Sequence, residues 1–269
     1  MIVALAGGVG GAKLAQGLYR ALPPDTLTII GNTADDFEHF GLRISPDLDT
    51  VLYTLAGIAD PQTGWGIAGD THQAFEQLAR YGGETWFSLG DRDFATHIQR
   101  SELLRAGWTL TAVTAELTRR LDVRAALLPM CDEPVRTVVA TPAGELAFQE
   151  YFVHRRHEDP VSAVRFTGLQ KATLPGGVAT ALRGAEAIVL CPSNPIVSLG
   201  PILAVPGLRD LLVQAPCPIV AVSPIVGGRA LKGPADRMLA GLGHDVSPVG
   251  VARLYQDFLT GLVLDEEDA

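Results

Sequence analysis

The stretch Ile2-Val3-Ala4-Leu5-Ala6-Gly7-Gly8-Val9-Gly10-Gly11-Ala12-Lys13-Leu14 decides the fold of this chain. An apolar run, four glycines among five residues and a helix-like pattern follow one another, which predicts a buried first strand, a tight turn and a helix start. Glycines at such a turn let backbone N–H groups approach a ligand closely, and the helix dipole adds partial positive charge. The stretch therefore predicts an anion site, most often for phosphate, with the candidate residues Gly8, Gly10, Gly11 and Lys13.

The turn fits neither of two common phosphate motifs. A Walker loop needs Gly-Lys followed by Ser or Thr, whereas Ala12 precedes Lys13 and Leu14 follows it. A dinucleotide fingerprint counted from Gly8 needs a glycine in the sixth place, where Lys13 stands. The alternative is that the glycines only make a tight turn with close helix packing. We favour phosphate binding because the turn lies at the start of the chain.

Composition limits the class of protein. The chain has 269 residues, and its 47% hydrophobic and 19% charged content exclude disorder. A formal charge of −9 argues against a nucleic-acid partner, because neutralising a phosphate backbone requires a basic face.

Cysteine usage and hydropathy bear on the compartment. Cys131, Cys191 and Cys217 are odd in number and far apart, which favours free thiols in a reducing cytoplasm over a disulfide framework or a zinc site. No run of about 18 apolar residues exists to span a bilayer, and the N-terminal run is unlike a signal peptide. We expect a cytoplasmic protein without a membrane partner.

Alternation of strand and helix patterns predicts an α/β fold, a Rossmann-like open parallel sheet with helices on both faces. Strands are expected at 27–30, 86–89, 187–191 and 219–222, and helices at 71–81, 94–104 and 178–182. Strand patterns at 125–130, 136–140 and 146–153 predict a β-rich insertion. The expected divisions are 1–123 for nucleotide binding with acceptor-site segments, 124–170 for the insertion, and 171–269 for the rest, whose acidic tail 265–268 is expected to be disordered.

Polar side chains follow several predicted strands. Asn32 and the pair Asp35–Asp36 follow the second strand, and Ser193 and Asn194 follow the strand at 187–191. In an open parallel sheet the carboxyl ends of the strands form the ligand crevice, so these residues are candidates for ribose, base or metal contacts. A solvated acidic turn is an equal alternative for the two aspartates.

Three further charged residues stand out. In the helix start at 45–52, Ser45 is expected to cap and Asp47 to complement the dipole, whereas Asp49 lies off the apolar stripe. Arg92 follows the strand predicted at 86–89, and its planar guanidinium suits bidentate contact with an anion. A surface ion pair with its neighbours Asp91 and Asp93 is the alternative.

Together these motifs resemble one family. The segments 7–13, 32–36, 45–53, 89–93, 192–195 and 255–258 look like those of the 2-phospho-L-lactate transferase family of coenzyme F(420) biosynthesis, and the likeness spans nearly the whole chain. The resemblance implies a transferase that moves a phosphate-bearing three-carbon acid, lactyl or enolpyruvyl, from a guanosine diphosphate-linked donor to the ribityl hydroxyl of 7,8-didemethyl-8-hydroxy-5-deazariboflavin. GMP is released, and the family requires Mg²⁺.

The resemblance also implies roles for individual residues and a homodimer. Asp49 and Arg92 match the deazaflavin-contacting positions and are the candidate catalytic residues, with Asp49 as proton acceptor. The nucleotide side is matched by the glycine turn with Asn32, Ser193 and Asn194, and Lys13 is expected to add charge stabilisation there. Carboxylates suit Mg²⁺, and Asp47 and Asp91 are the candidate ligands. One departure is that Val9 and Gly11 replace hydroxyl residues that are usual in the family's turn.

Two other functions remain open at this stage. A nucleotide-sugar-binding regulator of the related gluconeogenesis-factor type would share the glycine turn and the segment 32–36, but the segments 47–53 and 90–93 favour the transferase. An NAD-dependent dehydrogenase lacks support because the sixth-place glycine is absent.

Overall fold

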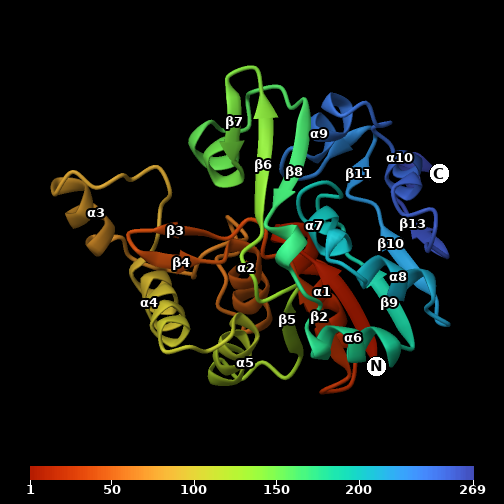
Figure 1. Ribbon diagram of the computed structural model, residues 1–269, viewed down its shortest axis with the longest axis horizontal. Coiled ribbons are helices and arrows are strands. Elements are labelled where there is room, and N and C mark those ends of the chain that lie inside the picture. The colour runs from red at the N-terminus through yellow and green to blue at the C-terminus, as the bar shows by residue number, and fades with distance from the viewer.

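The centre of the molecule is an open sheet of six parallel strands. A computed structural model describes residues 1–269. The strand order is β13-β10-β9-β1-β2-β5 (Figure 1). The strands are β1 (Ile2–Ala6), β2 (Leu27–Gly31), β5 (Ala126–Pro129), β9 (Ala187–Leu190), β10 (Ile219–Val222) and β13 (Gly261–Val263). This confirms the predicted α/β fold.

Helices cover both faces of this sheet. Successive side chains of a strand point to opposite faces, so Val3 and Leu5 enter one core while Ala4 and Ala6 enter the other. The Ala4 side is covered by α1 (Gly8–Ala21), α2 (Pro46–Leu55) and α5 (Leu110–Arg120). The Val3 side is covered by α6 (Gly176–Arg183), α7 (Leu199–Ala204), α8 (Leu208–Val213), α9 (Ala235–Gly241) and α10 (Pro248–Arg253).

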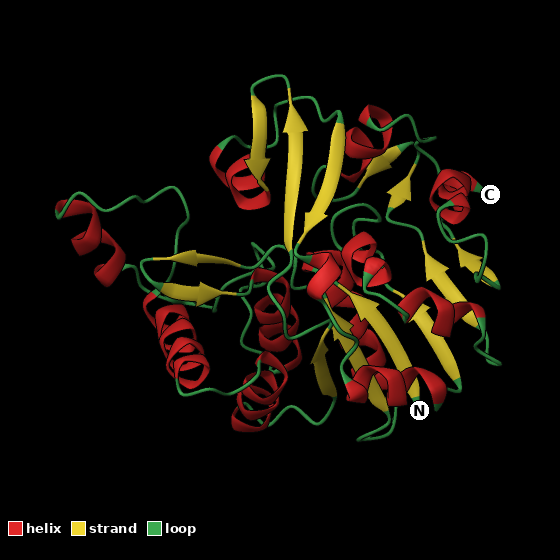
Figure 2. Ribbon diagram, in the orientation of Figure 1, coloured by secondary structure: helices red, strands yellow, loops and turns green.

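Three small antiparallel sheets are added to this centre. The largest has the order β7-β6-β8 and stands above the parallel sheet (Figure 2). The strands are β6 (Arg136–Thr141), β7 (Gly144–Ala147) and β8 (Ala163–Thr167), with the hairpins β3 (Phe37–His39)–β4 (Leu42–Ile44) and β11 (Ile225–Val226)–β12 (Arg229–Ala230).

The predicted insertion differs from the structure in two ways. The strand expected at 125–130 is β5, which pairs in parallel with β2 as an edge of the main sheet. The strand expected at 146–153 ends at Ala147, and a π-helical turn over Glu150–His154 follows. The apolar run at 126–129 pairs with the free edge of β2 and so joins the main sheet. The separate antiparallel sheet therefore begins only at Arg136.

The strand predicted at 86–89 is wrong. No strand forms there, although Phe87 and Leu89 pack in a small apolar cluster against β3, β4 and Phe94. The apolar pattern at 86–89 arises because these side chains are buried. The backbone there has no partner strand with which to form a sheet. Arg92 consequently lies in the first turn of α4 (Asp91–Arg105), which follows α3 (Gln73–Arg80).

The remaining expectations concern the tail, the thiols and membranes. The tail contains a short 3₁₀ helix at Glu266–Asp268, and the Gly227 N–H donates to the Asp268 carboxylate at 3.1 Å, so the expected disorder is wrong. The three cysteines are free, as predicted. None of the helices combines the length and the apolar character needed to cross a bilayer.

Candidate active site

The glycine turn connects β1 to α1 and packs against the loop that follows β9. Gly8 has φ +65°, a left-handed conformation that favours glycine. A Cβ at Gly10 would overlap the Pro192 carbonyl oxygen, and a Cβ at Gly11 would overlap the Ser193 hydroxyl. The Gly7 N–H donates to Ser193 Oγ at 3.0 Å. Close packing thus explains Gly10 and Gly11, and the helix N-terminus itself remains at the carboxyl edge of the sheet.

Asn32, at the end of β2, joins the turn to two carboxylates. Its Nδ2 donates to Asp35 Oδ2 at 3.0 Å and to Asp47 Oδ2 at 2.9 Å, and its Oδ1 accepts from the Ala34 N–H at 2.9 Å. Asn32 is fully buried. We call Asn32, Asp35 and Asp47 the Asn32 cluster. The cluster joins Asn32, at the end of β2, to Asp47, which lies 15 residues later at the start of α2.

The carboxylates of the Asn32 cluster are buried without a cation. Burial raises the pKa of Asp35 well above its usual range, and the neighbouring charge of Asp47 raises it further. Burial also raises the pKa of Asp47 to about 6, against the lowering effect of hydrogen bonds from Asn32 and the Gly8 N–H. Asp35 Oδ1 has no hydrogen-bond partner. Asp47 lies in the first turn of α2, as the sequence predicts, and the bond from Gly8 also places its carboxylate at the N-terminus of α1.

A second buried cluster contains Asp49, and here the charges are paired. Asp49 forms a bidentate ion pair with Arg100, in which Nη1 lies 3.0 Å from Oδ2. His97 lies between Asp49 and Asp93, with Nε2 3.2 Å from Asp93 Oδ1, and Tyr53 donates to the same oxygen at 2.7 Å. We call Asp49, Asp93, His97, Arg100 and Tyr53 the Arg100 cluster.

The pairing in the Arg100 cluster lowers the pKa of Asp93. Burial acts to raise the pKa of Asp93, but the hydrogen bond and charge of His97, together with Tyr53 and Arg100, outweigh it, so the pKa is lowered. Arg100 itself is only 2% exposed. A fully buried arginine with a bidentate carboxylate partner fixes the position of that carboxylate.

Asp36 lies between the two clusters. Burial raises its pKa to about 6, although Arg43, Ser45 and Arg100 lower it. Ser45 Oγ donates to Asp36 Oδ2 at 2.8 Å and makes no cap bond to α2, so the predicted capping role of Ser45 is wrong. The buried carboxylate of Asp36 takes the hydroxyl that the helix would otherwise use.

Arg92 and Asp91 lie at a junction of helices. The Arg92 side chain is 61% exposed, and its Nη2 donates to the Gly69 carbonyl at 2.7 Å. Asp91 accepts from the Thr71 hydroxyl and from the N–H groups of Gln73 and Ala74. Its oxygens therefore cap α3. Asp91 has this structural role and does not belong to the Asn32 cluster that contains Asp47.

The other predicted nucleotide residues shape the loop after β9. Asn194 Oδ1 accepts from the N–H groups of Ile196 at 2.9 Å and Val197 at 3.3 Å. Ser193 is buried and accepts from the turn, as described above. Lys13 is exposed on α1. The structure brings the turn, Asn32, Asp47, Ser193 and Asn194 together, and it places Asp49 in the neighbouring cluster.

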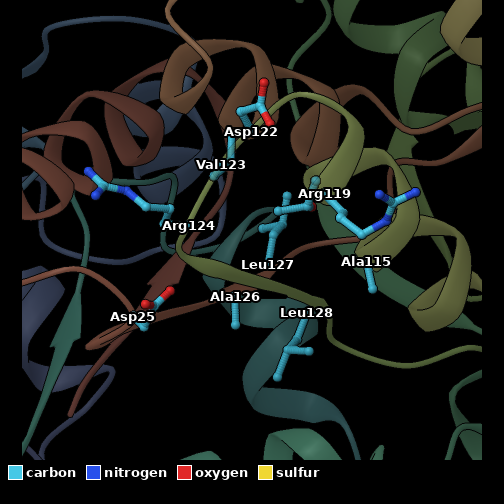
Figure 3. A pocket seen from close by; sticks show the side chains of 10 residues that line it. Asp25, Ala115, Arg119, Asp122, Val123, Arg124, Ala126, Leu127 and Leu128 are labelled. Atoms are coloured by element: carbon cyan, nitrogen blue, oxygen red, sulfur yellow. The ribbon is translucent and has the colours of Figure 1, made fainter.

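One cavity of the molecule does not coincide with this site. It has a volume of about 550 Å³ and lies beside α5 and the edge strand β5, where Asp25, Arg119, Arg124 and Leu127 are among its lining residues (Figure 3). Asp25 precedes β2 and Arg124 precedes β5, so the cavity is at the amino ends of the strands. Ligands of open parallel sheets bind at the opposite ends.

Comparison with known proteins decides the family. A profile for the 2-phospho-L-lactate transferase CofD matches residues 2–269. The chain belongs to the CofD family. It is therefore a transferase, and the regulatory alternative is not supported.

Relatives of this CofD chain cover its whole length. A phosphoenolpyruvate transferase from Streptomyces griseus is 47% identical over 100% of this chain and 86% of its own. A 2-phospho-L-lactate transferase from Methanosarcina mazei is 42% identical over 99% and 88%. A UPF0052 family protein of known structure from Bacillus halodurans shares the fold, with a TM-score of 0.61 at 16% identity over 98% of this chain and 91% of its own.

Sequence reasoning missed two residues of the Arg100 cluster. His97 follows Asp93 by four positions, and Arg100 follows His97 by three. This spacing places all three side chains on one face of α4. That spacing on an otherwise polar helix was the available signal. The partner of Arg100, Asp49, comes from 51 residues earlier, which no local pattern reveals.

Proposed function

We propose that this CofD-family enzyme moves a phospholactyl or phosphoenolpyruvyl group from a guanosine diphosphate-linked donor to the ribityl hydroxyl of 7,8-didemethyl-8-hydroxy-5-deazariboflavin, with release of GMP. The observation that carries the proposal is the Asn32 cluster, whose uncompensated carboxylates lie against a helix N-terminus. Anions and divalent cations bind together at such an arrangement, as a metal diphosphate does. The names of the relatives support both three-carbon acids.

The donor side comprises the α1 N-terminus and the residues packed on it. Backbone N–H groups at Gly10 and Gly11 would face the diphosphate, while Lys13 adds positive charge. Asn32, Ser193 and Asn194 hold this edge in shape and line the nucleotide side. Asp47 already accepts from Gly8, so a phosphate at the same place needs a cation between the two negative groups.

Mg²⁺ fits this requirement. Asp47 would hold it together with Asp35, whose Oδ1 is buried without a partner, while water and donor phosphates complete an oxygen shell. No group of three or more His, Cys, Asp or Glu side chains is arranged around a single point, so the chain supplies a partial ligand set. Asp91 fits less well because its oxygens cap α3. The ion would neutralise charge on the diphosphate.

The acceptor side comprises Asp49 and Arg92. Arg100 uses one lone pair on each Asp49 oxygen, and each oxygen keeps another that can accept from the ribityl hydroxyl. The hydroxyl oxygen attacks the phosphorus that carries the three-carbon acid, the bond to GMP breaks, and the hydroxyl proton passes to Asp49. Arg92 orients the acceptor with its exposed guanidinium. The transfer is direct, since Cys191 and Ser193 have no adjacent base.

The test is product analysis with purified enzyme. Enzyme, Mg²⁺, the deazaflavin and each guanosine diphosphate-linked acid are incubated, and GMP and the product mass are measured. The lactyl and enolpyruvyl products differ by two hydrogens, so the spectrum identifies the acid. Binding of GDP without any product would contradict the proposed reaction. GMP release with a matching protein adduct, in the absence of deazaflavin, would contradict direct transfer.

A further inference from the structure

One loop, residues 57–70, contacts the glycine turn and is held by two cationic side chains, one at its middle and one near its end. Gly64 in this loop has φ +80°, and a Cβ there would lie 2.6 Å from Val9 Cγ1 in the turn. Near one end Arg92 Nη2 donates to the Gly69 carbonyl at 2.7 Å. Nearer the turn, Lys232 Nζ donates to the Thr63 carbonyl at 3.0 Å.

Lys232 comes from a distant part of the chain to reach this place. It follows β12 and precedes α9, and its Nζ would lie 3.5 Å from a Cβ at Gly64, beside Val9. An ammonium group has three N–H donors, and Lys232 uses one of them on a neutral carbonyl. No carboxylate pairs with it, although the chain carries an excess of nine negative charges. Two donors and the whole charge are thus available beside the turn.

A diphosphate at the turn would need this charge. The buried carboxylate of Asp47 already lies against the turn at Gly7 and Gly8, and in its ionised form it repels an anion. A hydrogen bond between an ammonium and a phosphate is charge-assisted on both sides, and charge-assisted hydrogen bonds are about twice as strong as those between neutral groups. A bound diphosphate would therefore accept from the two free donors of Lys232, while the third donor keeps the Thr63 carbonyl and with it the loop.

We propose that Lys232 is a donor-binding residue that contacts the diphosphate and closes the 57–70 loop over it. The inference rests on the proposed function, because it takes the ligand of the turn to be a nucleoside diphosphate. Lys232 approaches the turn beside Val9, whereas Asp47 approaches it at Gly7 and Gly8, so the diphosphate would contact both Mg²⁺ and an ammonium.

The test compares GDP with guanosine in binding titrations at constant Mg²⁺. Lys232→Met keeps the side-chain stem and removes the charge, and we expect a loss of GDP affinity of about 10- to 100-fold, as for one charged hydrogen bond. Guanosine affinity is expected to stay within about twofold, because it has no phosphate, and Lys232→Arg is expected to retain most of the GDP affinity. Arg20→Met, at the far end of α1, removes an equal charge as a control.

The outcomes separate the inference from the function. GDP binding by Lys232→Met within about twofold of wild type would overturn the inference alone, since a charged contact is worth more. Equal weakening of GDP and guanosine would show a role in loop structure and would also overturn it. Failure of the wild-type protein to bind GDP would overturn the proposed function and this inference with it. Equal losses in Arg20→Met would show a general charge effect and overturn the specific contact.

Discussion

Helix α2 supplies one carboxylate to each of two buried clusters, and the two clusters differ in what faces those carboxylates. Asp47 meets Asn32 and another carboxylate, Asp35, and its pKa is raised to about 6. Two residues later, Asp49 meets the guanidinium of Arg100. Neighbouring residues of one helix thus lie in environments of opposite charge balance.

The difference suits the two clusters to different tasks. The Asn32 cluster is suited to ligand binding, and the Arg100 cluster is suited to holding a side chain in position. A buried charge without a partner destabilises the folded protein, and a cation that binds there recovers that free energy. The Asn32 cluster therefore suits a metal ion and its anion. The Arg100 cluster contains its own counter-charge, so it suits the task of holding Asp49 in one position, as the role proposed for Asp49 requires.

The largest expected effect comes from removing the cation of the Arg100 cluster. Arg100→Met leaves Asp49 buried without its partner, which we expect to lower the free energy of unfolding by about 3–5 kcal/mol. Urea denaturation measures this. Arg105→Met removes an exposed arginine from the same helix and is expected to cost less than about 1 kcal/mol. Equal costs for both variants would show that burial of the ion pair has no energetic importance.

The next effect distinguishes the two carboxylates of α2. Asp47→Asn is expected to lower turnover by about 10²- to 10³-fold, since it removes charge stabilisation of the metal diphosphate. The same change should leave the unfolding free energy of the metal-free protein unchanged or higher at pH 8, because it removes a poorly compensated charge.

Asp49→Asn provides the matched comparison, because it leaves Arg100 unpaired and should therefore reduce stability as well as turnover. Steady-state assays and urea denaturation on both variants measure the two effects. A clear loss of stability in Asp47→Asn and none in Asp49→Asn would reverse the comparison between the clusters.

The sequence predicted one cluster better than the other, for a physical reason. Asn32 and Asp47 follow the end of a strand and the start of a helix, which local patterns reveal, and the carboxyl ends of parallel strands necessarily meet. Arg100 lies in the middle of a polar helix, and its partner is 51 residues away. The fold was predictable from β1 and the turn, whereas the apolar run 86–89 resembles a strand because its side chains are buried.

The pH dependence of stability tests the raised carboxyls. Asp36 and Asp47 have folded-state pKa values of about 6, above the usual 3.8, so the folded state binds more protons between pH 4 and 6. Stability from these groups is complete below about pH 4 and is lost as pH rises through 6, on the order of 3 kcal/mol for each group. Asp93 has a lowered pKa, so the stability that it contributes is present above about pH 4 and is lost only at lower pH.

Thermal unfolding of the metal-free protein should accordingly show a higher Tm at pH 5.5 than at pH 7.5. In Asp47→Asn this difference should shrink. A Tm that rises steadily from pH 5.5 to 7.5 would show that cations compensate the Asn32 cluster already.

Magnesium should act in the opposite pH range. A cation that binds only the folded state adds about 1.4 kcal/mol of stability at ten times its Kd. We expect this gain at pH 7.5, where the carboxyls are ionised, and a smaller gain at pH 5.5, where protons compete. Calorimetric scans with Mg²⁺ and with a chelator measure it. An equal gain in Asp47→Asn would place the ion elsewhere.

The smallest effect concerns Asp36, which lies between the clusters and is partly compensated. Ser45→Ala removes the 2.8 Å hydrogen bond to Asp36 and so raises the pKa of that carboxyl further. Because the bond stabilises the ionised form, its loss should cost about 1 kcal/mol at pH 7.5 and less at pH 5, where Asp36 is protonated.

Thr109→Ala is the control for this last prediction, since Thr109 caps α5 by accepting from the Ala112 N–H and touches no carboxylate. Its loss should also cost about 1 kcal/mol, but equally at both pH values. Urea denaturation at pH 5 and pH 7.5 gives the four numbers. If the cost of Ser45→Ala were as independent of pH as that of Thr109→Ala, Asp36 would belong with the fully paired carboxylates of the Arg100 cluster. A cost that grows with pH would instead show a graded series in which each carboxylate is stabilised in proportion to the donors and cations that face it.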